Sequence, residues 1–278
     1  MIWMLRHDRR LPLDRPVVMG ILNLTPDSFS DGGRLATPAD AVAQARRMVA
    51  EGADILDVGG ESTRPGAAAV SEQEEISRVF PVVAAIRAEL DIPLSIDTRR
   101  AAVAHAALEA GADVVNDVSS LADPQMGALV AESGAGVVLM HMRGTPQTMQ
   151  GLADYQDVVG EVAEELRTCA ARARAAGIRD DAVVLDPGIG FSKTGAQNLQ
   201  LIAHLDALAA LGRPLLLGAS RKAFIGGLLG GIPAEARDAG TAGACVAGLL
   251  RGARIHRVHD VRTARHALDV AWAVMEAR

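Results

Sequence analysis

The sequence predicts an α/β protein folded as a single (β/α)₈ TIM barrel, with parallel strands and a functional site at their carboxyl ends. Eight short apolar segments alternate with helical ones, and their unbroken apolarity is typical of parallel strands covered on both faces. The length of 278 residues is usual for this barrel. No linker divides the chain, so we expect one domain over 1–278, with its core at about 17–273. A doubly wound open sheet is the alternative fold.

The expected strands are short, and turn-forming or polar residues follow them. They cover residues 16–24, 53–58, 93–97, 112–118, 136–141, 182–186, 214–218 and 253–258. Thr37 is the expected N-cap of the first helix, which ends before Gly52. Ser71 with Glu74 forms a capping box, and Thr98 caps the following helix. The later helices are expected at about 154–176, about 196–211, 223–229, 238–250 and after the last strand.

The composition excludes several classes of protein. The chain has 28 basic and 34 acidic residues, a net charge of −6 and no long basic run, so nucleic acid is not an expected partner. No apolar run is long enough for a membrane span, and residues 1–15 lack the apolar core of a signal peptide. Cys169 and Cys245 are interpreted as buried thiols in a reducing compartment. We therefore expect a soluble, cytoplasmic protein.

Polar side chains stand at the ends of the predicted strands. They are Asn23, Asp57, Asp97, Asn116, Asp117, His141, Asp186, Lys222, Arg257 and His259. Because the carboxyl ends of barrel strands meet at one face, we expect these residues to converge on a site. Single members have structural explanations: Asp97 can cap a helix, and Asp57 can hold its own loop. His141 is interpreted as a strand-end histidine with internal hydrogen bonds.

The strand at 214–218 runs into small residues, two cations and a helical segment. Backbone N–H groups at a helix start, together with Arg221 and Lys222, suit a bound anion. Arg257 and His259 add to this anion-binding side. The sequence therefore predicts a small anionic substrate.

Three of the strand-end residues have a different chemistry. Asp97 and Asp186 offer carboxylates that accept two N–H groups in one plane, and Asn116 offers both a donor and an acceptor. This combination suits a planar heterocycle with N–H donors, so the substrate is expected to carry both a heterocycle and an anionic group.

Seven motifs follow one another along the chain: GILNLTPDSFSDGG, ADILDVGGESTRPG, SIDT, NDVS, DPGIGF, GASRK and RVHDV. Together they resemble the dihydropteroate synthase family, from residue 17 to about residue 273. The resemblance implies a pterin-binding TIM barrel that joins 6-hydroxymethyl-7,8-dihydropterin diphosphate to 4-aminobenzoate in folate biosynthesis, with Mg²⁺ as cofactor. It also implies a homodimer and a sulfonamide target.

The resemblance assigns roles to individual residues. Asn23 is the expected ligand of Mg²⁺ and the diphosphate, and the expected catalytic residues are Asp97, Lys222 and Arg64. The expected substrate-binding residues are Phe29, Asp57, Thr63, Pro65, Asp97, Asn116, Asp186, Phe191, Lys222, Arg257, Val258 and His259.

Within this set, the resemblance divides the substrate into three parts. The pterin is expected deep in the barrel, on Asp97, Asn116, Asp186 and Lys222, with Asp57 at the rim of its pocket. Arg257 and His259 are expected to grip the diphosphate. The aminobenzoate is expected near Phe29, Pro65 and Phe191. Ile189 departs from the family pattern, in which a second aromatic residue is common.

The implied mechanism separates charge. Loss of diphosphate would leave a cation at the pterin methylene, and the enzyme would stabilise both ions while excluding water. Three alternatives stay open at this point. They are a Schiff-base aldolase that uses Lys222, a pterin-binding methyl-transfer domain with a corrinoid partner, and a pterin-binding paralogue without turnover.

Other conspicuous residues have structural interpretations. Trp3 and Trp272 are expected to be packing residues near the ends of the chain. Glu161, Glu164 and Glu165 are interpreted as a solvated helix face rather than a metal site.

Overall fold

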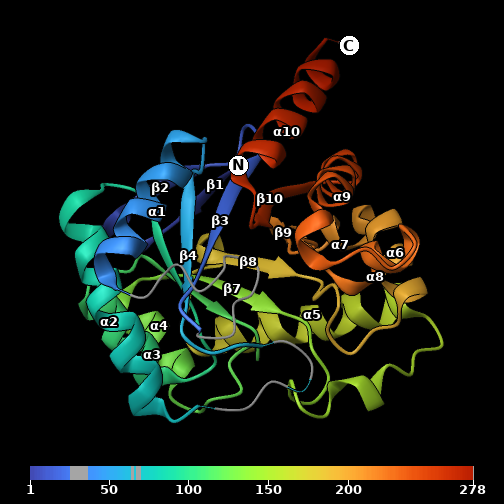
Figure 1. Cartoon of the computed structure of the whole chain (residues 1–278). Coiled ribbons are helices and arrows are strands. Elements are labelled where there is room, and N and C mark those ends of the chain that lie inside the picture. Colours follow the sequence, from blue (N-terminus) through green and yellow to red (C-terminus); the bar gives the residue numbers. More distant parts are fainter. Residues whose placement is uncertain (26–36, 64–65, 67–69, 278) are drawn as a thin grey trace.

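The computed structural model confirms the (β/α)₈ barrel (Figure 1). It describes residues 1–25, 37–63, 66 and 70–277. Eight parallel strands close in the order β10-β3-β4-β5-β6-β7-β8-β9. Their bounds are Val17–Asn23 (β3), Ile55–Gly59 (β4), Leu94–Asp97 (β5), Val114–Asp117 (β6), Gly136–Met140 (β7), Val183–Asp186 (β8), Leu215–Leu217 (β9) and Ala253–Val258 (β10).

Helices surround the barrel on the outside (Figure 1). Their bounds are Pro38–Ala50 (α1), Glu72–Glu89 (α2), Ala101–Glu109 (α3), Met126–Ser133 (α4), Val158–Ala175 (α5), Gly195–Ala203 (α6), Leu205–Ala209 (α7), Ala223–Leu228 (α8), Asp238–Leu250 (α9) and Val261–Glu276 (α10). Among the described residues, no helix has both the length and the apolar composition that crossing a bilayer requires.

Parallel pairing around the closed sheet fixes which side chains reach the same level. Asp57 of β4 is opposite Ile21 of β3, and Asp97 of β5 is opposite both Gly59 and Asn116. Because the strands end together at one face, this register brings their terminal polar residues to one level. Alternate residues of each strand face the barrel interior or the helices.

A hairpin that the sequence analysis did not predict closes the other end of the barrel. Its strands, β1 (Ile2–Met4) and β2 (Arg10–Pro12), are antiparallel. Trp3 is fully buried against the apolar residues of the barrel interior, and its Nε1–H donates to the carbonyl of Ala182 over 2.8 Å. This confirms Trp3 as a packing residue. Trp272 is only partly buried, with Arg254 over its ring.

Replacement of Trp3 by phenylalanine is expected to lower the free energy of unfolding by about 1–2 kcal/mol, because the buried carbonyl of Ala182 loses its donor. Urea denaturation measures this change. Trp272→Phe is the control, with an expected effect within about 0.5 kcal/mol. Equal effects of the two substitutions would contradict the role given to the Trp3 hydrogen bond.

The structure corrects some local predictions. Thr98 does not cap a helix: α3 begins at Ala101, and the Thr98 hydroxyl donates to Glu75 over 2.7 Å. The helix expected at about 196–211 is two helices, α6 and α7, which meet at His204 in a non-helical conformation. The cap at Thr37 is confirmed, with its reciprocal bonds to Asp40.

Candidate functional site

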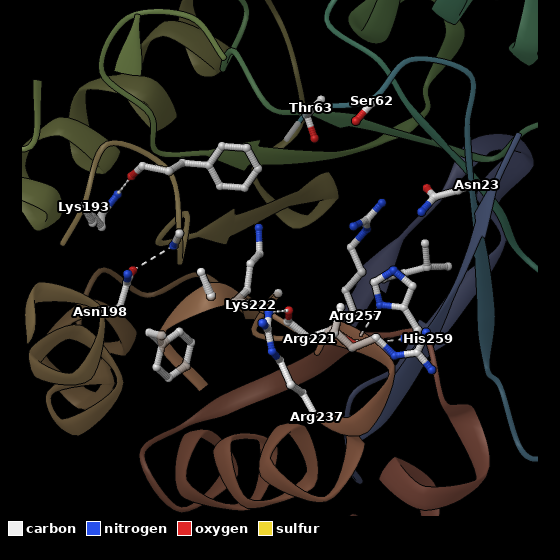
Figure 2. A pocket seen from close by; sticks show the side chains of 18 of the residues that line it. Asn23, Ser62, Thr63, Lys193, Asn198, Arg221, Lys222, Arg237, Arg257 and His259 are labelled. Carbon is white, nitrogen blue, oxygen red and sulfur yellow. Dashed lines mark hydrogen bonds between the residues drawn. The ribbon is translucent and has the colours of Figure 1, made fainter. Parts of the chain in front are cut away.

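A cavity of about 860 Å³ lies at the carboxyl ends of the strands. Its volume is in the range of small-molecule sites. Figure 2 shows Lys222 and Arg257 pointing into the same space, with Asn23 at its edge. The predicted site residues that line it are Asn23, Thr63, Asp97, Phe191, Lys222, Arg257 and His259.

Other predicted site residues lie beneath the cavity or away from it. Asp57 and Asn116 are buried within β4 and β6, and Asp186 is buried at the end of β8. The side chain of Val258 packs in the core between barrel and helices, so it does not face the cavity. The predictions for Phe29, Arg64 and Pro65 lie outside the described residues.

A partly buried arginine joins two buried carboxylates in the floor of the cavity. The Arg257 guanidinium donates from Nε to Asp57 Oδ2 and from Nη2 to Asp97 Oδ2, each over 2.6 Å. Asn116 Nδ2 also donates to Asp57 Oδ2, over 3.1 Å. The second oxygens, Asp57 Oδ1 and Asp97 Oδ1, are buried and accept no hydrogen bond from the part of the chain that the structure describes. Buried acceptors without donors are uncommon, and they point to a ligand that brings N–H groups.

Burial controls the ionisation of Asp97, which lines the cavity, and of Asp186, which lies buried at the end of β8. Desolvation raises the pKa of Asp97 to about 7, although Arg257 opposes the rise. Desolvation also raises the pKa of Asp186 to about 6, and this rise is opposed by a hydrogen bond from the Gly188 N–H and by the charge of Lys222. Both carboxyl groups therefore titrate close to neutral pH. Such pKa values are typical of functional sites.

The turn after β8 brings Phe191 to the cavity and bonds to the buried Asp186. Gly188 has a φ of +68°, donates to Asp186 Oδ1 over 2.7 Å, and lies so close to His141 that a Cβ would be 1.9 Å from its carbonyl oxygen. Only glycine is tolerated there. The ammonium nitrogen of Lys222 is 4.1 Å from the centre of the Phe191 ring, so the turn also positions a cation.

The anion-binding side differs in part from the prediction. Ser220 Oγ bonds to His259 Nδ1 over 2.9 Å and accepts from the His259 backbone N–H over 3.1 Å, which fixes the imidazole at the cavity. Arg221 also lines the cavity, but it forms a two-bond ion pair with Asp238, over 2.7 and 2.8 Å. Its charge is therefore largely offset by a protein carboxylate.

Several strand-end predictions have structural outcomes. His141 is confirmed as internally bonded, through Nδ1 to Lys193 and through Nε2 to Glu165, each over 2.9 Å. The side chain of Asp117 accepts from the N–H groups of its own turn, so it is structural.

The three glutamates of α5 are at least partly exposed, as the interpretation of a solvated face requires, but two of them also bond to residues outside the helix. Glu161 and Glu165 both pair with Arg143, and Glu165 also bonds to His141. Glu164 is exposed and pairs with Arg167 on its own helix.

Sequence reasoning missed several polar residues of the cavity, among them Ser220, Lys193 and Arg237. Arg237 donates to the carbonyls of Arg221 and Ile232, far along the chain from any strand end. Lys193 is buried only two residues after the DPGIGF motif. A lysine that close to a buried motif is a signal that could have marked it.

The comparisons with known proteins agree on one family. The family model described as pterin binding enzyme matches residues 19–259. A dihydropteroate synthase of Synechocystis sp. is 49% identical over 261 residues, which cover 94% of this chain and 90% of that protein.

Two solved structures extend this similarity to the fold. The Yersinia pestis dihydropteroate synthase in a sulfonamide drug complex has a TM-score of 0.95 and 44% identity, covering 99% of this chain and 100% of that one. The Xanthomonas albilineans dihydropteroate synthase in complex with 7,8-dihydropteroate has a TM-score of 0.87 and 44% identity, covering 97% of both chains. This chain therefore belongs to the dihydropteroate synthase family of pterin-binding transferases.

Proposed function

We propose that this protein condenses 6-hydroxymethyl-7,8-dihydropterin diphosphate with 4-aminobenzoate, to give 7,8-dihydropteroate and diphosphate. The observation that carries the proposal is the pair of buried carboxylate oxygens, Asp57 Oδ1 and Asp97 Oδ1, that lack donors among the described residues. Asp97 lines a cavity that also holds the cations Lys222 and Arg257, and Asp57 is buried beside it and bonded to the same Arg257. A pterin supplies N–H groups in one plane, and its diphosphate supplies the anion.

Asp97 and Asp186 would hold the pterin ring through its N–H groups, together with Asn116. Carboxylates beside the ring favour positive charge on it, so they would stabilise a cation at the pterin methylene after the C–O bond to diphosphate breaks. Lys222 would donate to the pterin carbonyl. We assign Asp97 and Lys222 as catalytic residues on this basis.

Arg257 would change partners when substrate binds. Its Nη2 donates to Asp97 Oδ2, the carboxylate proposed to receive pterin N–H groups. Pterin binding would replace this bond, and the Arg257 guanidinium would then bind the diphosphate beside His259 and Asn23. Arg64 is proposed as a further diphosphate contact and catalytic residue. The departing anion would then meet positive charge as it forms.

The aminobenzoate would enter against Phe191 and Thr63 after the pterin is bound. Phe29 and Pro65 are proposed to complete its pocket. Because water would trap a pterin cation as the alcohol, apolar walls around the amine are required for the condensation.

Mg²⁺ is the proposed cofactor. The described residues contain no group of three or more His, Cys, Asp or Glu side chains placed to hold a metal ion. Asn23 offers an amide oxygen at the cavity, and Gly59 leaves room there, since a Cβ would be 3.5 Å from Asn23 Oδ1. A single protein oxygen suits Mg²⁺ that arrives with substrate phosphates and retains its water. Bound in this way, the ion would supply positive charge for the leaving diphosphate.

We also propose a homodimer and a cytoplasmic location. Exposed apolar side chains lie along α9 and α10: Leu250 is 54% exposed, Val270 67% and Val274 63%. Figure 1 shows the end of α10 projecting beyond the barrel, where a second copy can cover it. Light scattering at several protein concentrations measures the mass. The free thiols of Cys169 and Cys245 suit a reducing compartment.

Diphosphate release, measured with a coupled assay, tests the proposed function. We expect release that needs both pterin diphosphate and 4-aminobenzoate, and that stops with a chelator and returns with Mg²⁺. The same reaction followed by mass spectrometry should yield 7,8-dihydropteroate. No release with both substrates and Mg²⁺ present would remove the synthase assignment and favour a paralogue without turnover or a methyl-transfer domain.

Activity is expected to fall when the pH is lowered through about 7. Asp97 and Asp186 accept N–H groups only as carboxylates, and burial raises their pKa values to about 7 and about 6. Both groups therefore become protonated, and lose this function, as the pH falls through these values. A pH profile of kcat/KM for the pterin diphosphate reports these groups in the free enzyme. A profile that stays flat between about pH 5 and about pH 8 would contradict the assignment.

A further inference from the structure

Lys193 is a buried lysine that none of the proposed steps uses. It lies in the turn 187–193, between β8 and α6, and only 4% of it is exposed. Figure 2 shows its amine at one side of the cavity, bonded to a backbone carbonyl. Burying an ammonium group is costly unless its protons are all bonded, so its partners indicate what it does.

The partners of Lys193 are the backbone of its own turn and a histidine. Its Nζ donates to the carbonyl of Phe191 over 2.9 Å and to the carbonyl of Gly188 over 3.2 Å. It also bonds to His141 Nδ1 over 2.9 Å. These partners account for the three protons of an ammonium group. Burial lowers the pKa of Lys193 to about 7, and the nearby carboxylate of Asp186 opposes this effect.

His141 connects Lys193 to helix α5. Burial, assisted by the charge of Lys193, lowers the pKa of His141 to about 4, so the imidazole is neutral and can accept at Nδ1. Its Nε2–H then donates to Glu165 over 2.9 Å. Glu165 also binds Arg143, whose backbone N–H donates to Ser192 Oγ over 3.0 Å. The turn is therefore held from two sides.

The backbone of this turn needs such support. Gly188 and Gly190 have φ values of +68° and +84°, and Ser192, which is not glycine, has a φ of +45°. Left-handed conformations at alternate residues make no regular hydrogen-bond ladder of their own. Phe191 lies between them, and its ring contacts the Lys222 ammonium at 4.1 Å.

We propose that Lys193 is a positioning residue, which holds the turn 187–193 so that Phe191 forms the wall of the aminobenzoate pocket. His141 and Glu165 fix Lys193 in turn. The inference rests on the proposed place of 4-aminobenzoate beside Phe191. The backbone of Asp186 is paired with β7 in the barrel, and Asp97 and Asn116 lie on other strands, so the aminobenzoate pocket depends on Lys193 more than the pterin pocket does.

The test is steady-state kinetics of Lys193→Met, which keeps the length of the side chain and removes its donors. We expect the KM for 4-aminobenzoate to rise about tenfold or more, from the loss of bonds to two carbonyls, and the KM for pterin diphosphate to change less than threefold. An equal rise in both KM values, or no change in either, would overturn the proposal. A role in stability alone would predict one of those two results.

Glu165→Gln keeps the proposal testable if Lys193→Met does not fold. The Glu165 side chain is 40% exposed, so this substitution leaves no cavity in the core. It weakens the hydrogen bond between residue 165 and His141. We expect a smaller rise, about threefold, in the KM for 4-aminobenzoate alone. Glu164→Gln, on the same helix but paired only with Arg167 among the contacts described here, is the matched control and should be unchanged. Equal KM values of the Glu165 and Glu164 variants for 4-aminobenzoate would overturn the proposal. Failure of the wild-type protein to release diphosphate would instead remove the proposed function.

Discussion

Replacement of Asp97 by asparagine is expected to lower kcat/KM for the pterin diphosphate by roughly 10²–10³, as removal of one preorganised electrostatic contact does in other enzymes. Asp97 Oδ1 is buried and receives no donor from the described residues, while Oδ2 is held by Arg257. An amide has the same shape but supplies only one acceptor and no negative charge. It cannot favour a cation on the pterin. Steady-state kinetics at a fixed pH above about 7 measures the loss.

Asp91→Asn is the control for this substitution. Asp91 lies in the connection between α2 and β5, its side chain is 96% exposed, and it pairs with Arg9. We expect its kinetics to equal those of the wild type. If Asp97→Asn also kept near-normal turnover, Asp97 would not be a catalytic residue, and the assignment of the cavity floor to the pterin would be wrong.

Replacement of Arg257 by methionine is expected to reduce both activity and stability. It leaves Asp57 and Asp97 buried beside each other without their shared cation, and breaking a buried pair of this kind typically costs about 3–5 kcal/mol. We expect kcat/KM to fall by roughly 10²–10³, since the developing diphosphate loses a cation as well. Urea denaturation and kinetics measure the two effects.

The pH profile of kcat/KM gives a second test of the same Arg257 variant. Arg257 lowers the pKa of Asp97 against the stronger effect of burial, so its removal raises that pKa above its value of about 7. Asp97 then becomes a carboxylate only at a higher pH, and the rise of kcat/KM should shift to higher pH. Arg262→Met is the control, because Arg262 is exposed and pairs with Glu51 on the outside of the barrel. If Arg257→Met kept the wild-type pH profile of kcat/KM, the proposed effect of Arg257 on the pKa of Asp97 would be contradicted.

The barrel could be predicted from the sequence because its signals are local. Each apolar segment is bounded by turn residues, and every predicted strand lies within two residues of an observed one. Convergence of Asn23, Asp97 and Lys222 on one cavity then follows from closure alone. The assignment of residues 1–278 to one domain stays a prediction.

What the sequence did not predict depends on partners that are distant along the chain. Arg257 was expected to bind the diphosphate. In the structure it bonds to the carboxylates of Asp57 and Asp97, which are 200 and 160 residues away along the chain. The Glu165–His141 contact likewise joins a helix to a strand end. The hairpin β1–β2 has strands of three residues, too short for a recognisable alternation, and its buried position depends on the open end of the barrel.

A crystal structure of this protein with the pterin diphosphate and Mg²⁺ would show directly where the pterin binds. We expect pterin N–H groups on Asp97 and Asp186, with Arg257 moved from Asp97 to the diphosphate beside Asn23. A pterin bound elsewhere, or one bound in the cavity while Arg257 still holds both Asp57 and Asp97, would contradict this expectation.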